Sequence, residues 1–324
     1  MIRNFFSLLI FFGLIIFLTI GCSKKNEIYT VGICEFTEDP SSKDAEQGFI
    51  KAFTDAGIIT DKDIRFKILN AQGDFSSISL IADKFVNDKV DMLCCLATPC
   101  LQACINTETK IPILFSRIAN PFLAGAGNNP QDHLINITGV ATTSPFTETI
   151  VLIKKLMPDV KVVGTVWSPS ELNSEYYTKL QKEAAEKAGL TIIAVPIHSS
   201  SEMNIAVFSL INRNIDCIYQ ISDNLTSIGF EAEVKAANDN KIPIFCNQIN
   251  EVERGAAMGL GWSYFDAGYE AGKLAVQVKN GESPGNIPIQ FMKRTELHIN
   301  LNSAEKQGLI IPDEIVKSAD KIFK

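Results

Sequence analysis

The stretch Tyr29-Thr-Val-Gly-Ile-Cys-Glu-Phe36 returns in outline as Lys161-Val-Val-Gly-Thr-Val-Trp-Ser168. Each copy is a short apolar run with a glycine, and it leads through a polar loop into an amphipathic segment that ends on Ala-Gly. In both copies the glycine of the run lies 25 residues before the glycine of that Ala-Gly pair. A β-like run followed by a helical segment predicts a strand and helix unit, and its recurrence predicts an internal repeat.

The repeat continues beyond its first unit. Asp91-Met-Leu-Cys-Cys-Leu-Ala-Thr98 matches Asp216-Cys-Ile-Tyr-Gln-Ile-Ser-Asp223, and Lys110-Ile-Pro-Ile113 matches Lys241-Ile-Pro-Ile244. Each half therefore reads strand, helix, strand, helix, strand, helix, strand, which predicts an α/β fold with two doubly wound parallel-sheet lobes. The expected helices include Ser42–Ala56, Ser76–Asn87, Ser174–Ala188, Glu202–Asn212 and Thr226–Asn240.

The rest of the chain predicts a hinge that is crossed several times. After the second half we expect a helix over 266–280, a Gly/Pro loop over 281–288, a strand over 289–295 and a last helix near Pro312–Phe323. The expected crossings lie near residues 139–143, 262–265 and 288–293. One lobe would then hold residues 29–141 plus about 265–288, and the other residues 142–264 plus about 289–324.

The N-terminus has the pattern of an export signal. Arg3 is the only charged residue before Lys24, and the 16 uncharged residues 5–20 are short for a spanning helix, which needs about 20. Gly21-Cys22 then resembles a bacterial lipobox, although Leu18 lies four residues before the cysteine and the usual spacing is three. We therefore predict a signal peptide over 1–21, a lipid on Cys22 and a tether over 22–28. The alternatives are an uncleaved anchor helix and a plain secretory signal.

Composition and cysteine placement exclude several kinds of protein. The chain is 46% hydrophobic and 21% charged, which suits two globular cores, and its net charge of −7 argues against a nucleic-acid partner. Seven cysteines follow Cys22, and most lie in apolar runs where they are expected to pack as small buried side chains. Cys100 and Cys104 could hold a soft metal, but a closed site needs more ligands than the sequence places nearby. No metal and no cofactor is expected.

The sequence favours binding over catalysis. It lacks GxSxG, GxxxxGK[ST], HExxH and CxxC motifs, it has no GxGxxG after the first strand, and its three histidines are isolated. The alternative is an exported α/β enzyme in which Glu35 and Asp223 form an acid/base pair.

The repeat also predicts where a ligand would bind. Ligands of open parallel sheets lie beyond the carboxyl ends of the strands, at the point where the strand order reverses. The equivalent positions just past the strand ends are Glu35 and Phe36 with Trp167 and Ser168, Thr98 with Asp223, and Ser116 and Arg117 with Asn247 and Gln248.

These positions have the chemistry to hold a zwitterion. Thr98 and Pro99 begin an expected helix, whose N–H groups and threonine hydroxyl could bind a carboxylate. Asp223 and Glu35 could accept hydrogen bonds from an ammonium group, and Phe36 and Trp167 could enclose an aromatic or aliphatic body. Thr98 and Asp223 would equally serve as helix N-caps, and the two aromatic residues as core.

The whole segment 28–324 resembles the bacterial ABC-transporter substrate-binding lipoproteins of the tryptophan/tyrosine type. The segments that carry the resemblance, in this order, include Val31-Gly-Ile33, Asn70-Ala-Gln-Gly-Asp74, Ala97-Thr-Pro99, Glu171-Leu-Asn173-Ser174, Ser222-Asp-Asn224 and Gly261-Trp-Ser-Tyr264. The resemblance implies the type I periplasmic-binding-protein fold, with an ABC permease and its ATPase as partners.

The resemblance also implies roles for individual residues. Thr98, Asn173, Ser174 and Asp223 with its neighbour Asn224 would surround the charged end of the ligand, with Glu35, Phe36 and Trp167 nearby. The chain departs from the family pattern at Asn120, where aspartate is common, at Arg117, where a small or apolar residue is common, and at Trp167-Ser168, which replaces a Tyr-Asn pair.

The expected protein is thus a lipid-anchored receptor on the periplasmic or extracellular side of the membrane. It would close two lobes over an aromatic or other apolar amino acid and present it to a permease. The alternatives are a sensor subunit for a nucleoside, vitamin or sugar, and the exported enzyme.

Overall fold

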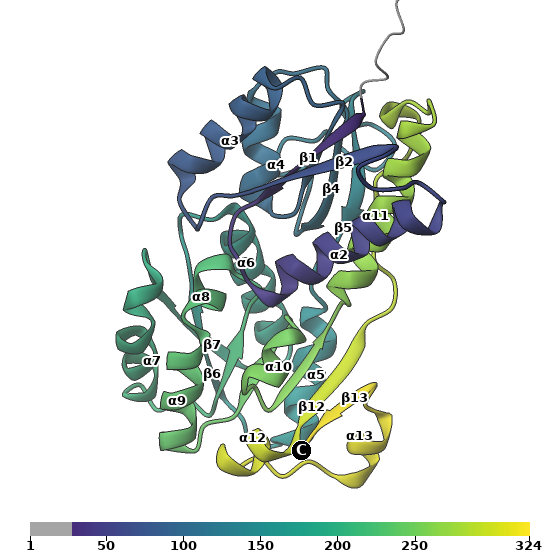
Figure 1. Ribbon diagram of the computed structural model, residues 1–324. Coiled ribbons are helices and arrows are strands. Elements are labelled where there is room, and N and C mark those ends of the chain that lie inside the picture. Colours follow the sequence, from purple (N-terminus) through teal and green to yellow (C-terminus); the bar gives the residue numbers. More distant parts are fainter. Residues whose placement is uncertain (1–27) are drawn as a thin grey trace, which may run out of the picture.

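The computed structural model describes residues 28–324, and these form two α/β lobes joined by several chain segments (Figure 1). The predicted signal peptide, the lipid attachment at Cys22 and residues 22–27 of the predicted tether lie outside the described residues. Within residues 28–324, no helix combines the length and the hydropathy needed to cross a membrane.

The first lobe is built on a six-stranded parallel sheet in the order β11-β5-β4-β3-β1-β2. Helices α3 and α4 pack on one face of this sheet, while α2 and α11 pack on the other. The strands are β1 Tyr29–Glu35, β2 Ile64–Asn70, β3 Met92–Cys95, β4 Ile113–Ile118, β5 Ile137–Ala141 and β11 Gln290–Phe291, and the helices are α2 Pro40–Asp55, α3 Phe75–Asn87, α4 Thr98–Asn106 and α11 Tyr264–Lys279.

The second lobe is built on a seven-stranded sheet in the order β13-β12-β10-β9-β8-β6-β7, in which only the β10 and β12 pair is antiparallel. Its strands are β6 Val162–Trp167, β7 Thr191–Pro196, β8 Cys217–Gln220, β9 Ile244–Cys246, β10 Met258–Gly261, β12 Glu296–Asn300 and β13 Lys321–Phe323. The helices are α5 Phe146–Leu156, α6 Leu172–Lys187, α7 Met203–Ile211, α8 Asn224–Ile228, α9 Phe230–Asn240, α10 Asn250–Arg254, α12 Leu301–Lys306 and α13 Asp313–Ser318, with the short 3-10 helix η2 Ser200–Glu202. A second short 3-10 helix, η3 Pro284–Asn286, lies beside β5 of the first lobe.

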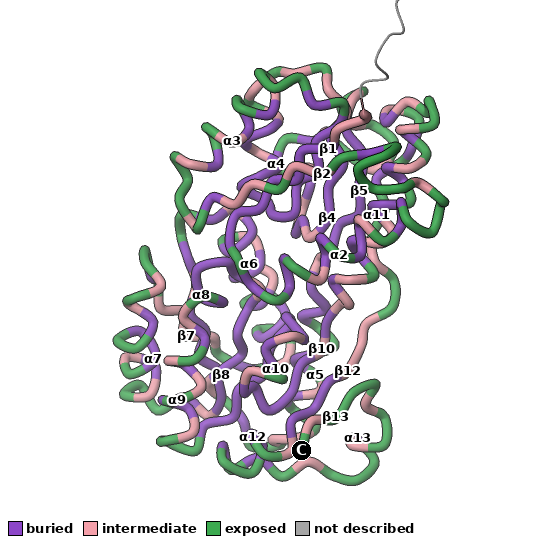
Figure 2. Tube along the Cα trace, in the orientation of Figure 1, coloured by how far each residue is buried: buried purple, intermediate pink, exposed green. Residues whose placement is uncertain are grey.

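The two sheets share one topology, which confirms the predicted fold class and the repeat. The order β2-β1-β3-β4-β5 in the first sheet has the counterpart β7-β6-β8-β9-β10 in the second. The strand order reverses at β1 and β3 in one lobe and at β6 and β8 in the other, so each lobe has one switch point. Buried residues follow the strands of both sheets, and exposed residues lie on the outer sides of the helices (Figure 2).

The glycines of the repeat lie where a side chain would clash with a neighbour or where the backbone is left-handed. A Cβ on Gly32 would lie 2.8 Å from the Phe85 ring, and one on Gly164 would lie 2.7 Å from Cδ1 of Ile215. Both positions therefore let buried side chains approach the strand closely. The glycines that follow α2 and α6 have φ of +77° and +75°, a left-handed conformation that glycine adopts at helix ends.

The chain passes between the sheets over residues 142–145, 262–263 and 292–295. The third crossing differs from the expectation, because the strand expected over 289–295 ends at Phe291, residues 292–295 form the crossing, and a new strand begins at Glu296. β11 pairs with β5 of the first sheet, and β12 pairs with β10 of the second. The Gly/Pro loop and the first part of the expected strand therefore belong with the first lobe, and the boundary expected at about 289 moves past Phe291.

Two expected helices also differ. The helix expected over Thr226–Asn240 divides at Gly229, where a Cβ would lie 2.8 Å from Cβ of Met203, so the close approach of α7 separates α8 from α9. The helix expected near Pro312–Phe323 ends at Ser318. Residues 321–323 instead form β13, because their backbone pairs with β12 at the edge of the sheet.

The cysteines after Cys22 are all buried and free, as expected for packing residues. Cys34, Cys95, Cys100 and Cys104 share the core between the first sheet and helices α3 and α4. Among the described residues, no group of three His, Cys, Asp or Glu side chains is arranged to hold a metal ion.

Two carboxyl groups are buried in the second lobe. Glu233 on α9 and Glu251 on α10 are fully buried, and their carboxyl oxygens have no hydrogen-bond partner within residues 28–324. Burial raises the pKa of Glu233 to about 8, and burial together with the nearby Glu233 raises the pKa of Glu251 well above its usual value. Both side chains are therefore protonated in the folded protein at neutral pH.

The variant Glu233→Gln should make stability less dependent on pH. The folded protein keeps the Glu233 proton up to about pH 8, while the unfolded chain loses it near pH 4.5, so the free energy of unfolding falls as pH rises through this window. Urea unfolding across this range should give a smaller decline for Glu233→Gln and a higher stability at its alkaline end. The control is Glu186→Gln on the exposed side of α6. A decline as steep as that of the parent would contradict this assignment.

Candidate functional site

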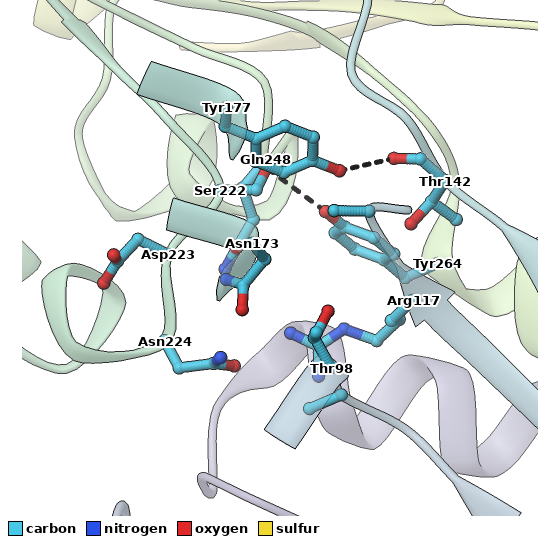
Figure 3. Close-up of a pocket in the computed structure, with 12 residues that line it drawn as sticks. Thr98, Arg117, Thr142, Asn173, Tyr177, Ser222, Asp223, Asn224, Gln248 and Tyr264 are labelled. Atoms are coloured by element: carbon cyan, nitrogen blue, oxygen red, sulfur yellow. Dashed lines mark hydrogen bonds between the residues drawn. The ribbon is translucent and has the colours of Figure 1, made fainter. Parts of the chain in front are cut away.

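A cavity lies between the two lobes, at the carboxyl ends of strands from both sheets (Figure 3). The free space inside it is about 20 Å³, which is room for only one or two water molecules, so a larger ligand requires the lining side chains or the lobes to move apart. Its lining residues are Ala97, Thr98, Arg117, Ala119, Thr142, Asn173, Tyr177, Ser222, Asp223, Asn224, Gln248 and Tyr264. Because both lobes contribute to its wall, a molecule in the cavity contacts both lobes at once.

Six of the positions predicted from the sequence line this cavity: Thr98, Arg117, Asn173, Asp223, Asn224 and Gln248. Thr98 follows β3, and Asp223 follows β8, which is the equivalent strand of the second repeat. The structure therefore brings together the two positions that the repeat pairs.

Three predicted residues support the lining from behind. The Ser168 backbone N–H donates to Asp223 Oδ2 at 3.0 Å and to Ser174 Oγ at 2.9 Å. Asn247 is tied into the second lobe, since its side-chain amide donates to Thr149 Oγ1 and accepts from the Tyr219 hydroxyl. Ser168, Ser174 and Asn247 therefore stabilise the wall but do not form its surface.

The expected aromatic sandwich is wrong. Phe36 is fully buried and packs against Phe75 with ring centroids 4.8 Å apart, and Trp167 packs against the core of the second lobe. Neither residue is part of the cavity lining. Side chains alternate between the two faces of a strand, and Phe36 continues the alternation of β1 beyond Glu35. Its side chain therefore points, like that of Cys34, to the face covered by α3 and α4.

Glu35, Pro99 and Ser116 are also outside the lining. Glu35 is buried, its Oε2 accepts a hydrogen bond from Asn70 Nδ2 at 3.0 Å, and burial raises the pKa of its carboxyl group. Pro99 and Ser116 are buried next to the lining residues Thr98 and Arg117. The ammonium partner and the acid/base pair expected to include Glu35 are therefore not formed at this cavity.

The first-lobe wall presents hydrogen-bond donors. Helix α4 begins at Thr98, and its N-cap residue Ala97 has no side chain that could accept from the first turn. Pro99 has no N–H, and the Leu101 N–H donates to the Ala97 carbonyl. The Thr98 and Cys100 N–H groups are therefore those that the first turn leaves for a ligand. The Thr98 hydroxyl is buried and makes no hydrogen bond to any described residue.

Arg117 enters the cavity through an irregularity in β4. The register between β4 and β5 shifts between Phe115 and Ile118, and Arg117 has φ of +60°, a left-handed value that is uncommon for arginine. Its guanidinium donates to Ser42 Oγ and to the Leu96 carbonyl, at 3.4 Å for the carbonyl. The bulge therefore aims a buried cation at the cavity.

Asp39 balances this cation. Its carboxylate caps helix α2 by accepting from the backbone N–H groups of Ser41 and Ser42, and Oδ1 lies 3.6 Å from Arg117 Nη2. Burial opposes ionisation of Asp39, but the Arg117 guanidinium and the hydrogen bonds from Ser42 outweigh it and lower the pKa of the carboxyl group. The pair is therefore ionised at neutral pH.

The second-lobe wall presents acids. Asp223 caps α8, with Oδ1 accepting from the Thr226 N–H at 2.9 Å, and burial raises the pKa of its carboxyl group. Glu171 lies behind Asn173 and Asn224, accepts hydrogen bonds from both of their side chains, and accepts from the Leu225 N–H at 3.1 Å. Burial and the neighbouring Asp223 raise the pKa of Glu171 to about 8.

The cavity is therefore polarised from one lobe to the other. Its first-lobe wall holds Thr98, the start of α4 and Arg117, while its second-lobe wall holds Asp223 and the orphan Oδ1 of Asn173, for which residues 28–324 offer no donor. Donors on one side and acceptors on the other suit a small molecule with an anionic group and a cationic group.

Tyr177 and Tyr264 supply the aromatic surface of the cavity. The Tyr177 hydroxyl donates to the Thr142 carbonyl at 2.8 Å, and the Tyr264 hydroxyl donates to Ser222 Oγ at 3.3 Å (Figure 3). Tyr264 and Ser222 stand in segments that carry the family resemblance, so the sequence contained signals for both, although neither is among the predicted site residues. Tyr177 lies inside α6, and no sequence pattern marks it.

Comparison with known proteins identifies similar chains. Residues 30–323 match the family described as ABC transporter substrate binding protein. A protein named tyrosine-binding protein from Clostridioides difficile (strain R20291) is 34% identical over 307 residues, which are 92% of this chain and 88% of that protein.

Two solved structures bear on how the lobes are arranged. A Streptococcus pneumonia ABC domain in complex with L-Trp has a TM-score of 0.87 at 27% identity, and a ligand-free, open substrate binding protein from Clostridium difficile has a TM-score of 0.70 at 29% identity. Each alignment covers 92% of this chain and 100% of the other. At nearly equal identity, this chain superposes better on the L-Trp complex than on the ligand-free, open structure.

A hydrogen bond between the lobes, away from the cavity, fits this arrangement. Asn250 Nδ2 on α10 of the second lobe donates to Asp44 Oδ2 on α2 of the first, at 2.7 Å. A hydrogen bond to a charged group contributes about 1.5–3 kcal/mol when formed. It can therefore shift a balance between open and closed lobes.

The variant Asp44→Ala should favour the open arrangement. Loss of the bond to Asn250 removes an interaction that exists only when the lobes are together, so small-angle scattering of the ligand-free protein should give a larger radius of gyration. Asp55→Ala is the matched control, because Asp55 lies on the same helix and contacts Lys51 and Tyr269 but not the second lobe. Equal radii for the two variants would show that the Asp44 bond does not influence closure.

Proposed function

Because the chain belongs to the family of ABC transporter substrate-binding proteins, we propose that it binds an amino-acid zwitterion between its lobes and presents it to an ABC permease. A protein 34% identical is named tyrosine-binding, and a similar solved structure contains L-Trp, so an aromatic amino acid is the ligand class that these relatives support.

The observation that carries the proposal is the polarised cavity. The ligand carboxylate would lie against the start of α4 and Thr98, and its ammonium group would lie against Asp223 and Asn173. On each wall one protein group is free to bind the ligand, since the Thr98 hydroxyl and Asn173 Oδ1 have no hydrogen-bond partner in the described part of the chain. A ligand that fills both needs contacts the two lobes together and favours their closure.

The apolar part of the ligand would lie beside the tyrosines once the lobes move apart enough to admit it. Tyr177 and Tyr264 both line the cavity, together with Ala97 and Ala119, whose side chains are short. Aromatic rings pair favourably with other rings in tilted or offset arrangements. The two tyrosines would thus take the role that the sequence suggested for Phe36 and Trp167.

The variant Asp223→Asn should weaken ligand binding by removing the negative charge of Asp223 while keeping a side chain of nearly the same shape. Asparagine keeps one acceptor oxygen, which can hold the Thr226 N–H that caps α8, but it loses the second acceptor that faces the Ser168 N–H, and it cannot neutralise an ammonium group. Loss of such a partner in a closed cavity costs about 2–5 kcal/mol, or about thirtyfold or more in affinity. Thermal-shift screening of the parent with the amino acids would identify the ligand, and calorimetric titration would then compare the variant.

Asp216→Asn is the control. Asp216 precedes β8, at the opposite end of the strand from Asp223, where it accepts hydrogen bonds from two backbone N–H groups outside the cavity. Asp223→Asn protein that binds as tightly as this control would remove Asp223 from the ligand site. A parent that responds to no amino acid would count against the ligand class and would favour a nucleoside, vitamin or sugar.

The N-terminal pattern supports a lipid anchor at Cys22 on the outer side of a membrane, with residues 1–21 as signal peptide. The anchor would keep the receptor close to its permease, with residues 22–28 as a tether. The two lobes, each with its own sheet, would move about the crossings at 142–145, 262–263 and 292–295.

Metabolic labelling with a fatty-acid analogue tests the anchor. Parent protein should incorporate the label and Cys22→Ala should lose it, while Cys217→Ala should keep it because Cys217 is buried in the second lobe. Label retained by Cys22→Ala would place the lipid elsewhere.

A further inference from the structure

The Arg117 side chain is buried at the cavity and is fixed there by an aromatic ring and a carboxylate. Its side chain is only 7% exposed, its guanidinium lies 5.0 Å from the centre of the Tyr264 ring, and Asp39 lies on its other side. A non-glycine residue in the left-handed region persists only where its surroundings hold it there. The bulge, the ring and the carboxylate together fix the direction of the guanidinium.

The hydrogen bonds of Arg117 leave its buried Nε–H without an acceptor within the described residues. Nη1 donates to Ser42 and to the Leu96 carbonyl, and Nη2 faces Asp39, but the buried Nε–H has no acceptor among residues 28–324. The hydroxyl of Thr98, on the same wall of the cavity, is likewise without a partner in the described chain. Buried donors of this kind cost free energy unless a ligand satisfies them.

We propose that Arg117 is a specificity-determining residue that, together with Thr98, makes a carboxylate a requirement for the ligand. The proposal rests on the proposed function and goes beyond it by naming the residue that selects the anionic group.

The donor pattern explains why a carboxylate is preferred to its neutral relatives. The Arg117 Nε and the backbone N–H groups at the start of α4 can only donate. A carboxylate only accepts, so it satisfies them, whereas a carboxamide brings two N–H groups of its own to a wall that has few acceptors. A dianion such as a phosphate monoester would suit the wall less well, because the Asp39 carboxylate lies 3.6 Å from the same guanidinium.

The experiment compares acids with their amides. L-tyrosine with L-tyrosinamide and L-tryptophan with L-tryptophanamide would be titrated calorimetrically into the parent and into Arg117→Gln, at about pH 6, where the amino groups are protonated. The parent should bind each acid at least about thirtyfold more tightly than its amide. Arg117→Gln should lose about tenfold or more of its affinity for the acid and about threefold or less for the amide, so the preference should shrink.

Arg254→Gln is the matched control. Arg254 also stacks on an aromatic ring, 5.2 Å from the centre of Phe230, and also pairs with a carboxylate, Glu231, but it does not line the cavity. Its loss should leave the acid-to-amide preference of the parent intact. An equal loss of preference in this control would mean that a stacked ion pair matters only for stability.

A second variant keeps the test decisive if Arg117→Gln does not fold. Thr98→Val removes the hydroxyl with little change in shape and should also reduce the preference for the acid. Variants that bind the acids with the parental preference would overturn the role of Arg117 and leave amino-acid binding intact. A parent that binds none of the four compounds would overturn both this role and the proposed aromatic amino-acid ligand.

Discussion

Parallel pairing of β1 with both β2 and β3, repeated by β6 with β7 and β8, is the constraint on which the rest of this structure depends. At these strands the chain moves first to one side of the sheet and then to the other, so the loops that follow β1 and β3 diverge and leave a gap. Since both lobes have the same topology and face each other across the hinge, the two gaps meet. The cavity is the space that this meeting creates.

The same constraint explains the polarity of the cavity. The loop after β3 leads directly into α4, whose first-turn N–H groups point back to the strand ends, and the loop after β8 begins with Ser222 and Asp223. Equivalent positions therefore carry different chemistry, with donors in the first lobe and a carboxylate in the second. A zwitterion can satisfy both walls only when the lobes are together, so its binding energy is available to drive closure.

The buried carboxyl groups of this site accept hydrogen bonds from nearby residues. Asp39 accepts two N–H groups at the start of α2 and faces Arg117, and Glu171 accepts from Asn173, Asn224 and the backbone of α8. Such arrangements repay part of the cost of removing a charge from water. Glu233 and Glu251 have no such hydrogen bonds from any described residue, and burial raises the pKa of both, as it does that of Glu171.

The sequence by itself determined the fold class, the repeat, and the placement of Thr98 and Asp223 at equivalent strand ends. These features follow from local signals: apolar runs that form strands, glycines that permit close packing or left-handed turns, and residues that begin helices. The crossing after Phe291 and the strand at 321–323 needed the tertiary structure, because short edge strands form only where a partner offers its backbone.

The cavity wall also needed the tertiary structure. Strand alternation directs Phe36 into the core, and a bulge directs Arg117 toward the cavity. Helix packing brings Tyr177 and Tyr264 to the ligand site. Whether a side chain past a strand end faces the core or the cavity depends on a rotation of the backbone that residue types alone do not encode.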